Sequence, residues 1–108
     1  MWSFLGGQNV ISYTAAKTAI AGLTKGISNE LAPLGVCVNA IAPGFVKTDI
    51  NKVVHSDADR SAPITSRIPM GRWGRPNDLT GAAIFLASPA SDYITGVVMP
   101  VDGGFLAN

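Results

Sequence analysis

Tyr13 and Lys17 are the residues whose types and spacing most directly suggest chemistry, because they lie four positions apart in the segment SYTAAK. Residues four apart share one face of a helix, so an ammonium group would lie beside a phenol. A free phenol titrates near pH ~10, and a fixed cation beside it favours the phenolate and moves its pKa towards neutral pH. Such a pair can act as a general acid or base. By spacing alone, the alternative is an amphipathic helix with a partly buried tyrosine and a solvated lysine.

The segment around this pair has the period of an amphipathic helix over about residues 12–34. Ser12 is the predicted N-cap, and Pro33 with Gly35 is predicted to end the helix. Small residues beside the apolar stripe would let another helix or another subunit pack closely, although helix propensity explains them equally well. The stripe that we expect to face the core consists of Ala16, Ile20, Leu23, Ile27 and Leu31.

Two apolar runs are predicted to be strands of a parallel sheet. Residues 36–43 (VCVNAIAP) have almost no polar alternation, which is typical of a strand buried on both faces, and residues 97–101 form a shorter terminal strand. Residues 44–75 between them are predicted to be a long polar loop. Pro76 begins a predicted helix to about residue 88, which with its loop is long enough for a parallel crossover. The apolar positions of that helix are Leu79, Ala82, Ala83, Phe85 and Leu86.

The composition indicates one small domain of 108 residues, with 47% apolar residues, 14% charged residues and a formal net charge of +1. A nearly neutral chain offers little basic surface, so we expect neither nucleic acid nor a membrane as a partner. No apolar run reaches the ~18–20 residues that span a bilayer, and the N-terminus does not have the pattern of a signal peptide. A single cysteine, Cys37, excludes an internal disulfide and a cysteine zinc cluster, so we expect no metal and a cytoplasmic protein.

Four motifs follow one another along the chain: SYTAAK, NAIAPGFVKTD, GRWGRPNDL and VDGG. In this order and at these separations they resemble the short-chain dehydrogenase/reductase family over essentially the whole sequence. The resemblance implies an α/β fold, namely the C-terminal part of a Rossmann-like doubly wound parallel sheet, built as long helix, strand, substrate loop, helix and strand. Residues 1–108 would be a single partial domain. Two strands are a poor sheet by themselves, because buried parallel strands need partners on both edges and helices on both faces.

The resemblance implies the roles of Tyr13 and Lys17 in a redox reaction. In the family, the tyrosine of the Y-x-x-x-K motif exchanges a proton with a carbonyl or alcohol oxygen while hydride passes to or from a nicotinamide. The lysine holds the ribose and lowers the pKa of the tyrosine. We therefore expect an NAD(P)-dependent enzyme that interconverts a secondary alcohol and a ketone.

The remaining cofactor contacts that the resemblance implies lie after the first predicted strand. The family's PG motif, here Pro43 and Gly44, would line the nicotinamide of NAD or NADP. Val46 would meet the carboxamide, and Thr48 would meet a phosphate or amide. This placement agrees with the physics of doubly wound sheets, which bind ligands at the carboxyl ends of their strands.

The substrate is expected to be a small molecule covered by residues 49–69, the family's mobile substrate segment. The GRWG motif at residues 71–74 resembles members that act on sugar acids such as gluconate or 2-deoxygluconate, and reduction of a 3-oxoacyl thioester is the alternative. Three charged residues of the segment are predicted to be solvated rather than catalytic or substrate-binding: His55, Arg60 and Arg67. The resemblance also implies a homo-oligomer in the full-length family member.

Other family features do not occur in this sequence. It contains no glycine-rich strand–turn of the kind that holds the pyrophosphate, so a preference for NAD or NADP is not readable. The family's substrate serine would fall just before Met1, so neither Ser3 nor Ser12 corresponds to it, and Asn9 and Asn39 do not match the family's relay asparagine. The competing hypothesis is a catalytically inactive truncated fragment that at most associates with another chain.

Overall fold

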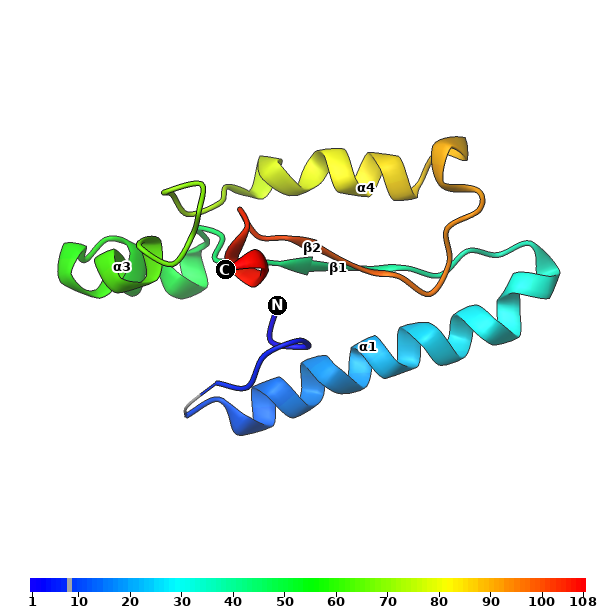
Figure 1. The fold of residues 1–108 in the computed structure, drawn as a ribbon, viewed down its shortest axis with the longest axis horizontal. Helices are drawn as coiled ribbons and strands as arrows, with labels where there is room; N and C mark the ends of the chain where they lie inside the picture. Colours follow the sequence, from blue (N-terminus) through cyan, green and yellow to red (C-terminus); the bar gives the residue numbers. More distant parts are fainter. Residues whose placement is uncertain (8) are drawn as a thin grey trace.

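The protein forms three layers in the computed structural model, which describes residues 1–7 and 9–108. Strands β1 (Ala40–Pro43) and β2 (Val98–Val101) lie in the middle layer (Figure 1). The long helix α1 (Ile11–Leu31) covers one face of this sheet, and α4 (Thr80–Leu86) covers the other. The shorter elements are η1 (Ala32–Leu34), η2 (Asp49–Asn51), α2 (Lys52–His55), α3 (Ala58–Thr65), η3 (Pro76–Leu79), η4 (Pro89–Ser91) and η5 (Phe105–Ala107).

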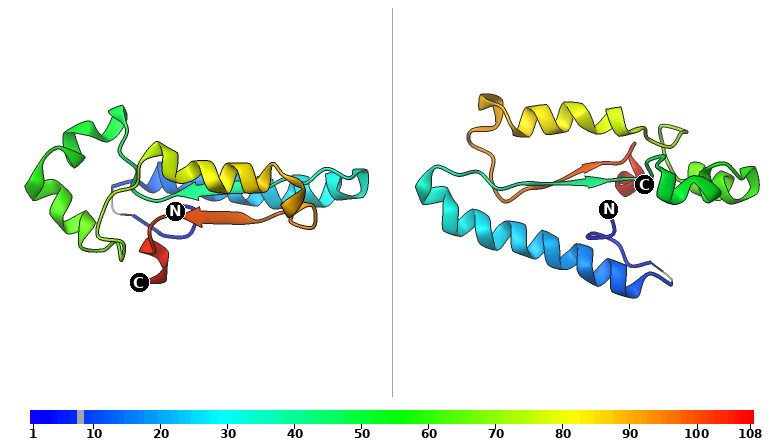
Figure 2. Two further views of the ribbon diagram at one scale, coloured as in Figure 1. Left: turned by 90° about the horizontal axis from the view of Figure 1, so that it is seen from above. Right: turned by 180° about the vertical axis from the view of Figure 1, so that it is seen from behind.

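β1 and β2 are parallel neighbours, with Ala40 opposite Val98 and Pro43 opposite Val101. The chain passes from one strand to the other through α2, α3 and α4. Figure 2 shows α2 and α3 beyond the carboxyl ends of the strands and α4 running back along the sheet. The predicted α/β class, the parallel pairing and the order of helix, strand, substrate segment, helix and strand are confirmed.

The first strand is shorter and less buried than predicted. β1 begins only at Ala40, and Ala42 is the one buried residue in it. Because the other three residues of β1 are partly or fully exposed, the prediction of a strand buried on both faces is wrong. In the part of the chain that the structure describes, β1 has a single neighbouring strand. Asn39, just before β1, donates its side-chain amide to the carbonyl of Ile94 (2.8 Å) and accepts the N–H of Val97 (3.0 Å). Asn39, the one polar residue of the predicted strand, therefore links the segment before β1 to the segment before β2.

Helix α1 begins at Ile11, one residue before the predicted start, and ends at Leu31, three residues before the predicted end, where η1 continues to Leu34. Its N-cap is Val10, which makes no side-chain capping bond, so the assignment of Ser12 as the cap is wrong. At the other end, Pro33 lies in η1 and Gly35 adopts a left-handed conformation with φ of +76°. This positive φ is the conformation that glycine supplies after a helix.

The buried face of α1 differs from the predicted apolar stripe. Thr24 and Ser28 are the buried residues of the helix, whereas Ile20 and Leu23 are exposed, as is Ala16. The hydroxyl groups of Thr24 and Ser28 bond to carbonyls of the same helix at 2.8 Å, which removes most of the cost of burying them. Small side chains are needed here because Gly96 approaches so closely that a Cβ on it would lie 2.8 Å from the Ser28 Oγ.

The stretch predicted to be a polar loop contains helices. Residues 44–75 include η2, α2 and α3, so the prediction of a long irregular loop is wrong. Asp57 caps α3 by accepting the N–H of Arg60 at 3.1 Å. No helix among the described residues combines the length and the apolar character needed to cross a membrane.

The buried core of the described residues lies near the carboxyl ends of the strands. Met1, Ile68, Trp73 and Phe105 are buried together there. Phe45, in the loop after β1, joins this cluster, and the centroid of its ring is 5.3 Å from those of Trp73 and Phe105 in edge-on geometry. The loop that follows β1 is therefore anchored by aromatic packing.

Replacing Phe45 with alanine should lower the free energy of unfolding by about 3 kcal/mol, because it removes aromatic edge contacts and leaves a cavity. Tyr93 is fully exposed, so Tyr93→Ala is a matched control that should change the value by less than about 0.5 kcal/mol. Urea unfolding followed by circular dichroism measures both variants. Equal shifts of the two unfolding midpoints would contradict the anchoring role of Phe45.

Candidate functional site

Tyr13 and Lys17 lie one turn apart in the first half of α1. The Nζ of Lys17 is 5.2 Å from the centroid of the Tyr13 ring, which is within the range of a cation–π contact. Half of the Tyr13 surface is exposed (50%). Both side chains line a cavity of about 720 Å³, and ligand-binding clefts commonly have volumes of roughly 300–1,000 Å³.

The end of β1 and the loop after it form another wall of this cavity. Pro43, Gly44, Val46 and Thr48 line it, so the structure brings all the site residues predicted from the sequence around one hollow. Their chemical roles remain predictions. Further residues that line it include Trp2, Ser3, Phe45, Asn51 and Trp73.

The loop leaves β1 through a position that admits only glycine. A Cβ on Gly44 would lie 2.6 Å from the Cα of Asp102, and a backbone atom cannot move aside as the tip of a side chain can. The N–H of Gly44 donates to the carbonyl of Val101 at 3.0 Å. The carboxylate of Asp102 in turn accepts the N–H groups of Gly104 and Leu106, both at 2.9 Å. The start of the loop is thus fixed against the end of β2.

Val46 lies between two hydrogen bonds that join the loop to Gly74. The N–H of Gly74 donates to the carbonyl of Phe45 (2.8 Å), and the N–H of Lys47 donates to the carbonyl of Gly74 (2.9 Å), which makes a parallel bridge. Since the N–H and C=O of a peptide point in opposite directions, the N–H of Val46 points away from Gly74. Within residues 1–7 and 9–108, that N–H has no hydrogen-bond partner.

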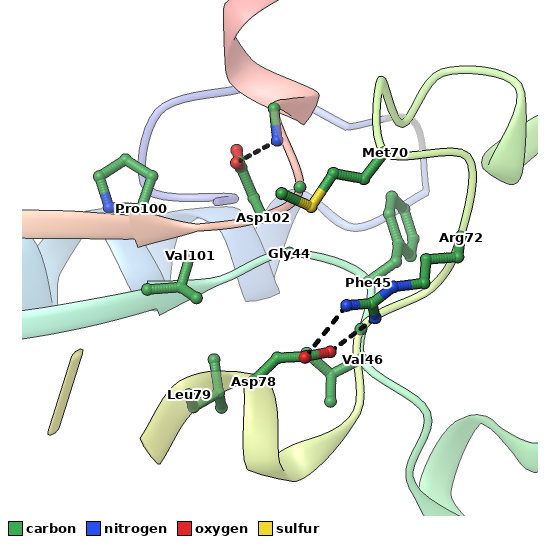
Figure 3. A pocket seen from close by; sticks show the side chains of 13 residues that line it. Gly44, Phe45, Val46, Met70, Arg72, Asp78, Leu79, Pro100, Val101 and Asp102 are labelled. Carbon is green, nitrogen blue, oxygen red and sulfur yellow. Dashed lines mark hydrogen bonds and ion pairs between the residues drawn. The ribbon is translucent and has the colours of Figure 1, made fainter. Parts of the chain in front are cut away.

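The turn that carries Gly74 is braced by an ion pair between Arg72 and Asp78, visible in Figure 3. The guanidinium donates to both carboxylate oxygens, at 2.7 and 3.1 Å. The same carboxylate accepts the N–H of Arg75 at 2.7 Å. The hydrogen bond from Arg72, followed by that from Arg75, lowers the pKa of Asp78 to about 2, and the Asp78 partner raises the pKa of Arg72.

A second hollow of about 360 Å³ is also lined by residues of this loop (Figure 3). Met70, Arg72 and Val101 are among the residues that line it. Phe45 and Val46 line both this hollow and the larger cavity. The loop is therefore a wall between two cavities, and Tyr13 and Lys17 line only the larger one.

Two of the three charged residues predicted to be solvated make specific contacts. The Nε2 of His55 is 3.3 Å from the carbonyl oxygen of Thr48, and its half-buried ring meets Trp73 edge-on at 5.9 Å. The guanidinium carbon of Arg67 lies 4.5 Å from the centroid of the Phe105 ring. The prediction of a solvated side chain is therefore wrong for His55 and incomplete for Arg67, whereas Arg60 is exposed. None of the three lines the larger cavity.

Sequence reasoning missed Asn51 as a site residue. Its side chain donates to the carbonyl of Val46 (2.7 Å) and accepts the N–H of Thr48 (2.9 Å). The signal was present in the sequence, because a threonine followed three residues later by an amide side chain resembles a capping box at the start of a helix. Trp2 and Ser3 also line the cavity, but their contribution depends on tertiary packing that no local pattern reveals.

A parallel sheet between two helical layers, with a cavity at the carboxyl ends of its strands, defines an α/β protein of the doubly wound class. A family model described as Enoyl-(Acyl carrier protein) reductase matches residues 3–106. The chain belongs to the short-chain dehydrogenase/reductase family, as its motifs indicate.

Relatives of known name match this chain over part of their own length. A 2-dehydro-3-deoxy-D-gluconate 5-dehydrogenase of Dickeya dadantii (strain 3937) is 53% identical over 107 residues, which are 99% of this chain and 42% of that protein. A crystal structure from Agrobacterium tumefaciens with bound NADP, provisionally named a 2-deoxy-D-gluconate 3-dehydrogenase, is 52% identical, with a TM-score of 0.95 over 99% of this chain and 44% of that one. A gluconate 5-dehydrogenase from Burkholderia cenocepacia J2315, in complex with NADP and tartrate, is 41% identical, with a TM-score of 0.95 over 99% and 42% of the respective chains. The chain thus spans less than half the length of these relatives.

Low pH should lower the free energy of unfolding partly through protonation of Asp78. Its pKa in the folded protein is about 2 against an ordinary value of 3.8, so the unfolded chain binds this proton more tightly. The stabilisation is present above pH 3.8 and is lost as the pH falls from there towards 2. Urea midpoints at about pH 5 and about pH 2.5 should therefore differ less in Asp78→Asn than in the unmodified protein. Asp59→Asn, at an exposed aspartate, is the control, and an unchanged pH dependence in Asp78→Asn would contradict the brace.

The contact between Gly44 and Asp102 predicts a strong position dependence for glycine substitutions. Gly44→Ala should lower the free energy of unfolding by about 1–3 kcal/mol, because the new methyl group meets backbone atoms. Gly22 in α1 has nothing within 4 Å of a built Cβ, so Gly22→Ala should raise the same quantity by up to about 1 kcal/mol. Chemical denaturation measures the free energy of unfolding of both variants. An unchanged free energy of unfolding in Gly44→Ala would refute the close approach.

Proposed function

We propose that this protein is the C-terminal catalytic part of an NAD(P)-dependent oxidoreductase that interconverts a secondary alcohol and a ketone, with residues 1–108 as one partial domain. The observation that carries the proposal is that Tyr13 and Lys17 line the same cavity as Val46 and Thr48. A phenol that can exchange a proton, a neighbouring cation and a backbone donor without a partner among the described residues are groups that this chemistry uses.

The lining of the cavity fits a nicotinamide cofactor. Gly44 offers backbone with no side chain, and the N–H of Val46 is a donor with no partner in the described part of the chain. Among the described residues that line the cavity, Lys17 is the one lysine or arginine and none is an aspartate or glutamate, which suits a ligand with anionic groups. In this proposal Val46 holds the carboxamide, Lys17 the ribose, and Thr48 a phosphate or amide, with Pro43 beside the ring. Bound NAD or NADP supplies or accepts the hydride.

Tyr13 exchanges the proton in this mechanism. Its phenolic oxygen gives a proton to the substrate oxygen during reduction and takes it back during oxidation. The ammonium of Lys17, 5.2 Å from the centroid of the ring, places positive charge where negative charge develops as the phenol loses its proton. Trp2 and Trp73 line the same cavity with aromatic surface.

We propose a sugar acid, such as gluconate or 2-deoxygluconate, as the substrate. The names of the relatives from Dickeya dadantii, Agrobacterium tumefaciens and Burkholderia cenocepacia support this choice, and the last was crystallised with tartrate, a hydroxy acid. The description of the matching family model supports the alternative of an acyl thioester. A cytoplasmic location and a homo-oligomeric full-length family member remain parts of the proposal.

The second candidate is a chain that associates with another polypeptide and has no activity alone. The exposed apolar residues of α1 favour it, because Ile20 and Leu23 are 48% and 61% exposed although they lie on a helix of a mostly apolar protein.

An assay on the purified chain separates the two candidates. Oxidation of gluconate and 2-deoxygluconate with NADP is followed by absorbance, and binding of NADPH by its fluorescence. Tyr13→Phe should lower kcat by at least about 100-fold with little change in NADPH affinity, because it removes the exchanged proton and leaves the binding groups.

Lys25→Ala, at an exposed lysine further along α1, is the control and should leave turnover unchanged. Turnover that survives Tyr13→Phe would overturn the assigned mechanism. An unmodified chain that neither binds NADPH nor oxidises these acids would overturn the enzymatic proposal in favour of the inactive chain.

A further inference from the structure

We infer that Asn51 is a positioning residue that holds Val46 and Thr48 in the geometry with which they face the cavity. The inference rests on the proposed function, because it concerns the wall to which that function assigns the cofactor. Asn51 lies in η2, at the start of the segment expected to cover the substrate. It is half-buried and lines the cavity itself.

Both ends of the Asn51 amide are used on the loop. The Nδ2 donates to the carbonyl of Val46 at 2.7 Å, and the Oδ1 accepts the N–H of Thr48 at 2.9 Å. A primary amide supplies both the donor and the acceptor that these two bonds need. A carboxylate of similar length lacks the donor, and the single oxygen of a hydroxyl does not span the two backbone groups. One side chain therefore fixes the peptide after Val46 and the peptide before Thr48.

The opposite edge of the loop is fixed by Gly74. Its N–H and C=O bond to Phe45 and Lys47, so the bonds to Gly74 and those to Asn51 alternate along the loop. Gly74 orients the N–H of Val46, because that N–H shares a peptide with the carbonyl of Phe45, whereas Asn51 holds the carbonyl of Val46. Gly74 makes no bond to Thr48, whose N–H is held by Asn51.

Thr48 is consequently the residue most dependent on Asn51. Its carbonyl oxygen accepts the backbone N–H of Asn51 at 3.3 Å and lies 3.3 Å from the Nε2 of His55. Loss of the Asn51 side chain leaves the N–H of Thr48 and the carbonyl of Val46 without these partners. The peptide before Thr48 can then rotate, whereas the peptide after Val46 keeps the bond from the N–H of Lys47 to the carbonyl of Gly74.

Two readouts on the complete chain test this inference. The first is hydrogen exchange of the Thr48 amide, measured by NMR, which needs no cofactor. The second is the dissociation constant for NADPH, measured by fluorescence. In Asn51→Ala, the Thr48 amide should exchange at least about tenfold faster and NADPH should bind about tenfold more weakly, as expected for lost hydrogen bonds.

The conservative variant and the control separate positioning from a general loss of fold. Asn51→Asp keeps an acceptor for the N–H of Thr48 but loses the donor to Val46, so its Thr48 exchange should lie between that of the unmodified protein and that of Asn51→Ala. Asn29→Ala, on the exposed surface of α1, should change neither quantity.

Each outcome decides one of the two ideas. NADPH affinity that is unchanged in Asn51→Ala overturns the inference and leaves the proposed function standing. Failure of the unmodified chain to bind NADPH overturns the proposed function for this chain, and Thr48 exchange then decides the inference. Thr48 exchange that is the same in all variants overturns the inference in either case.

Discussion

The backbone contact between Gly44 and Asp102 determines where the candidate site lies. The parallel register of β1 and β2 ends with Pro43 opposite Val101, so the next residues of the two chains meet directly. They approach so closely that a Cβ on Gly44 would be 2.6 Å from the Cα of Asp102. The loop after β1 therefore starts at a fixed point beside the end of β2, and its residues line the same cavity as the Tyr13–Lys17 face of α1.

From that point the loop is held on two edges by groups distant in sequence. Gly74 bonds one edge, and the Arg72–Asp78 pair braces the turn that carries it. The side chain of Asn51 bonds the other edge. Phe45 packs into the aromatic cluster between them. A short segment with no strand partner of its own thus acquires a defined shape, and preorganised backbone groups of this kind are effective binding groups.

The sequence predicts the site better than it predicts the packing. The four-residue spacing of Tyr13 and Lys17 and the motif at residues 43–48 place their residues around one cavity, because helical period and strand ends are local properties. The apolar stripe through Ile20 and Leu23 mispredicts the buried face of α1. There the close approach of Gly96 favours Thr24 and Ser28, whose hydroxyls bond within the helix.

The contacts of His55 and Asn51 could not be predicted from local sequence patterns, because they depend on how separate segments of the chain pack together. His55 follows no periodic pattern, and its place against Trp73 and Thr48 depends on how α2 folds back over the loop. Asn51 carried a signal as part of a capping pattern, but its bond to Val46 requires the loop to turn back on itself. Helix α3 was missed because its polar composition resembles that of a loop, although Asp57 caps it.

In the proposed function, the loop after β1 and the Tyr13–Lys17 face of α1 form one cofactor site. An NMR titration of the uniformly ¹⁵N-labelled chain with NADP, recording backbone amide shifts, tests whether they do. We expect saturable shifts that concentrate at residues 13–17 and 44–48, with the amide of Val46 among the most strongly affected. Saturable shifts confined instead to the second hollow, around Met70 and Leu79, or no shifts at millimolar NADP, would contradict it.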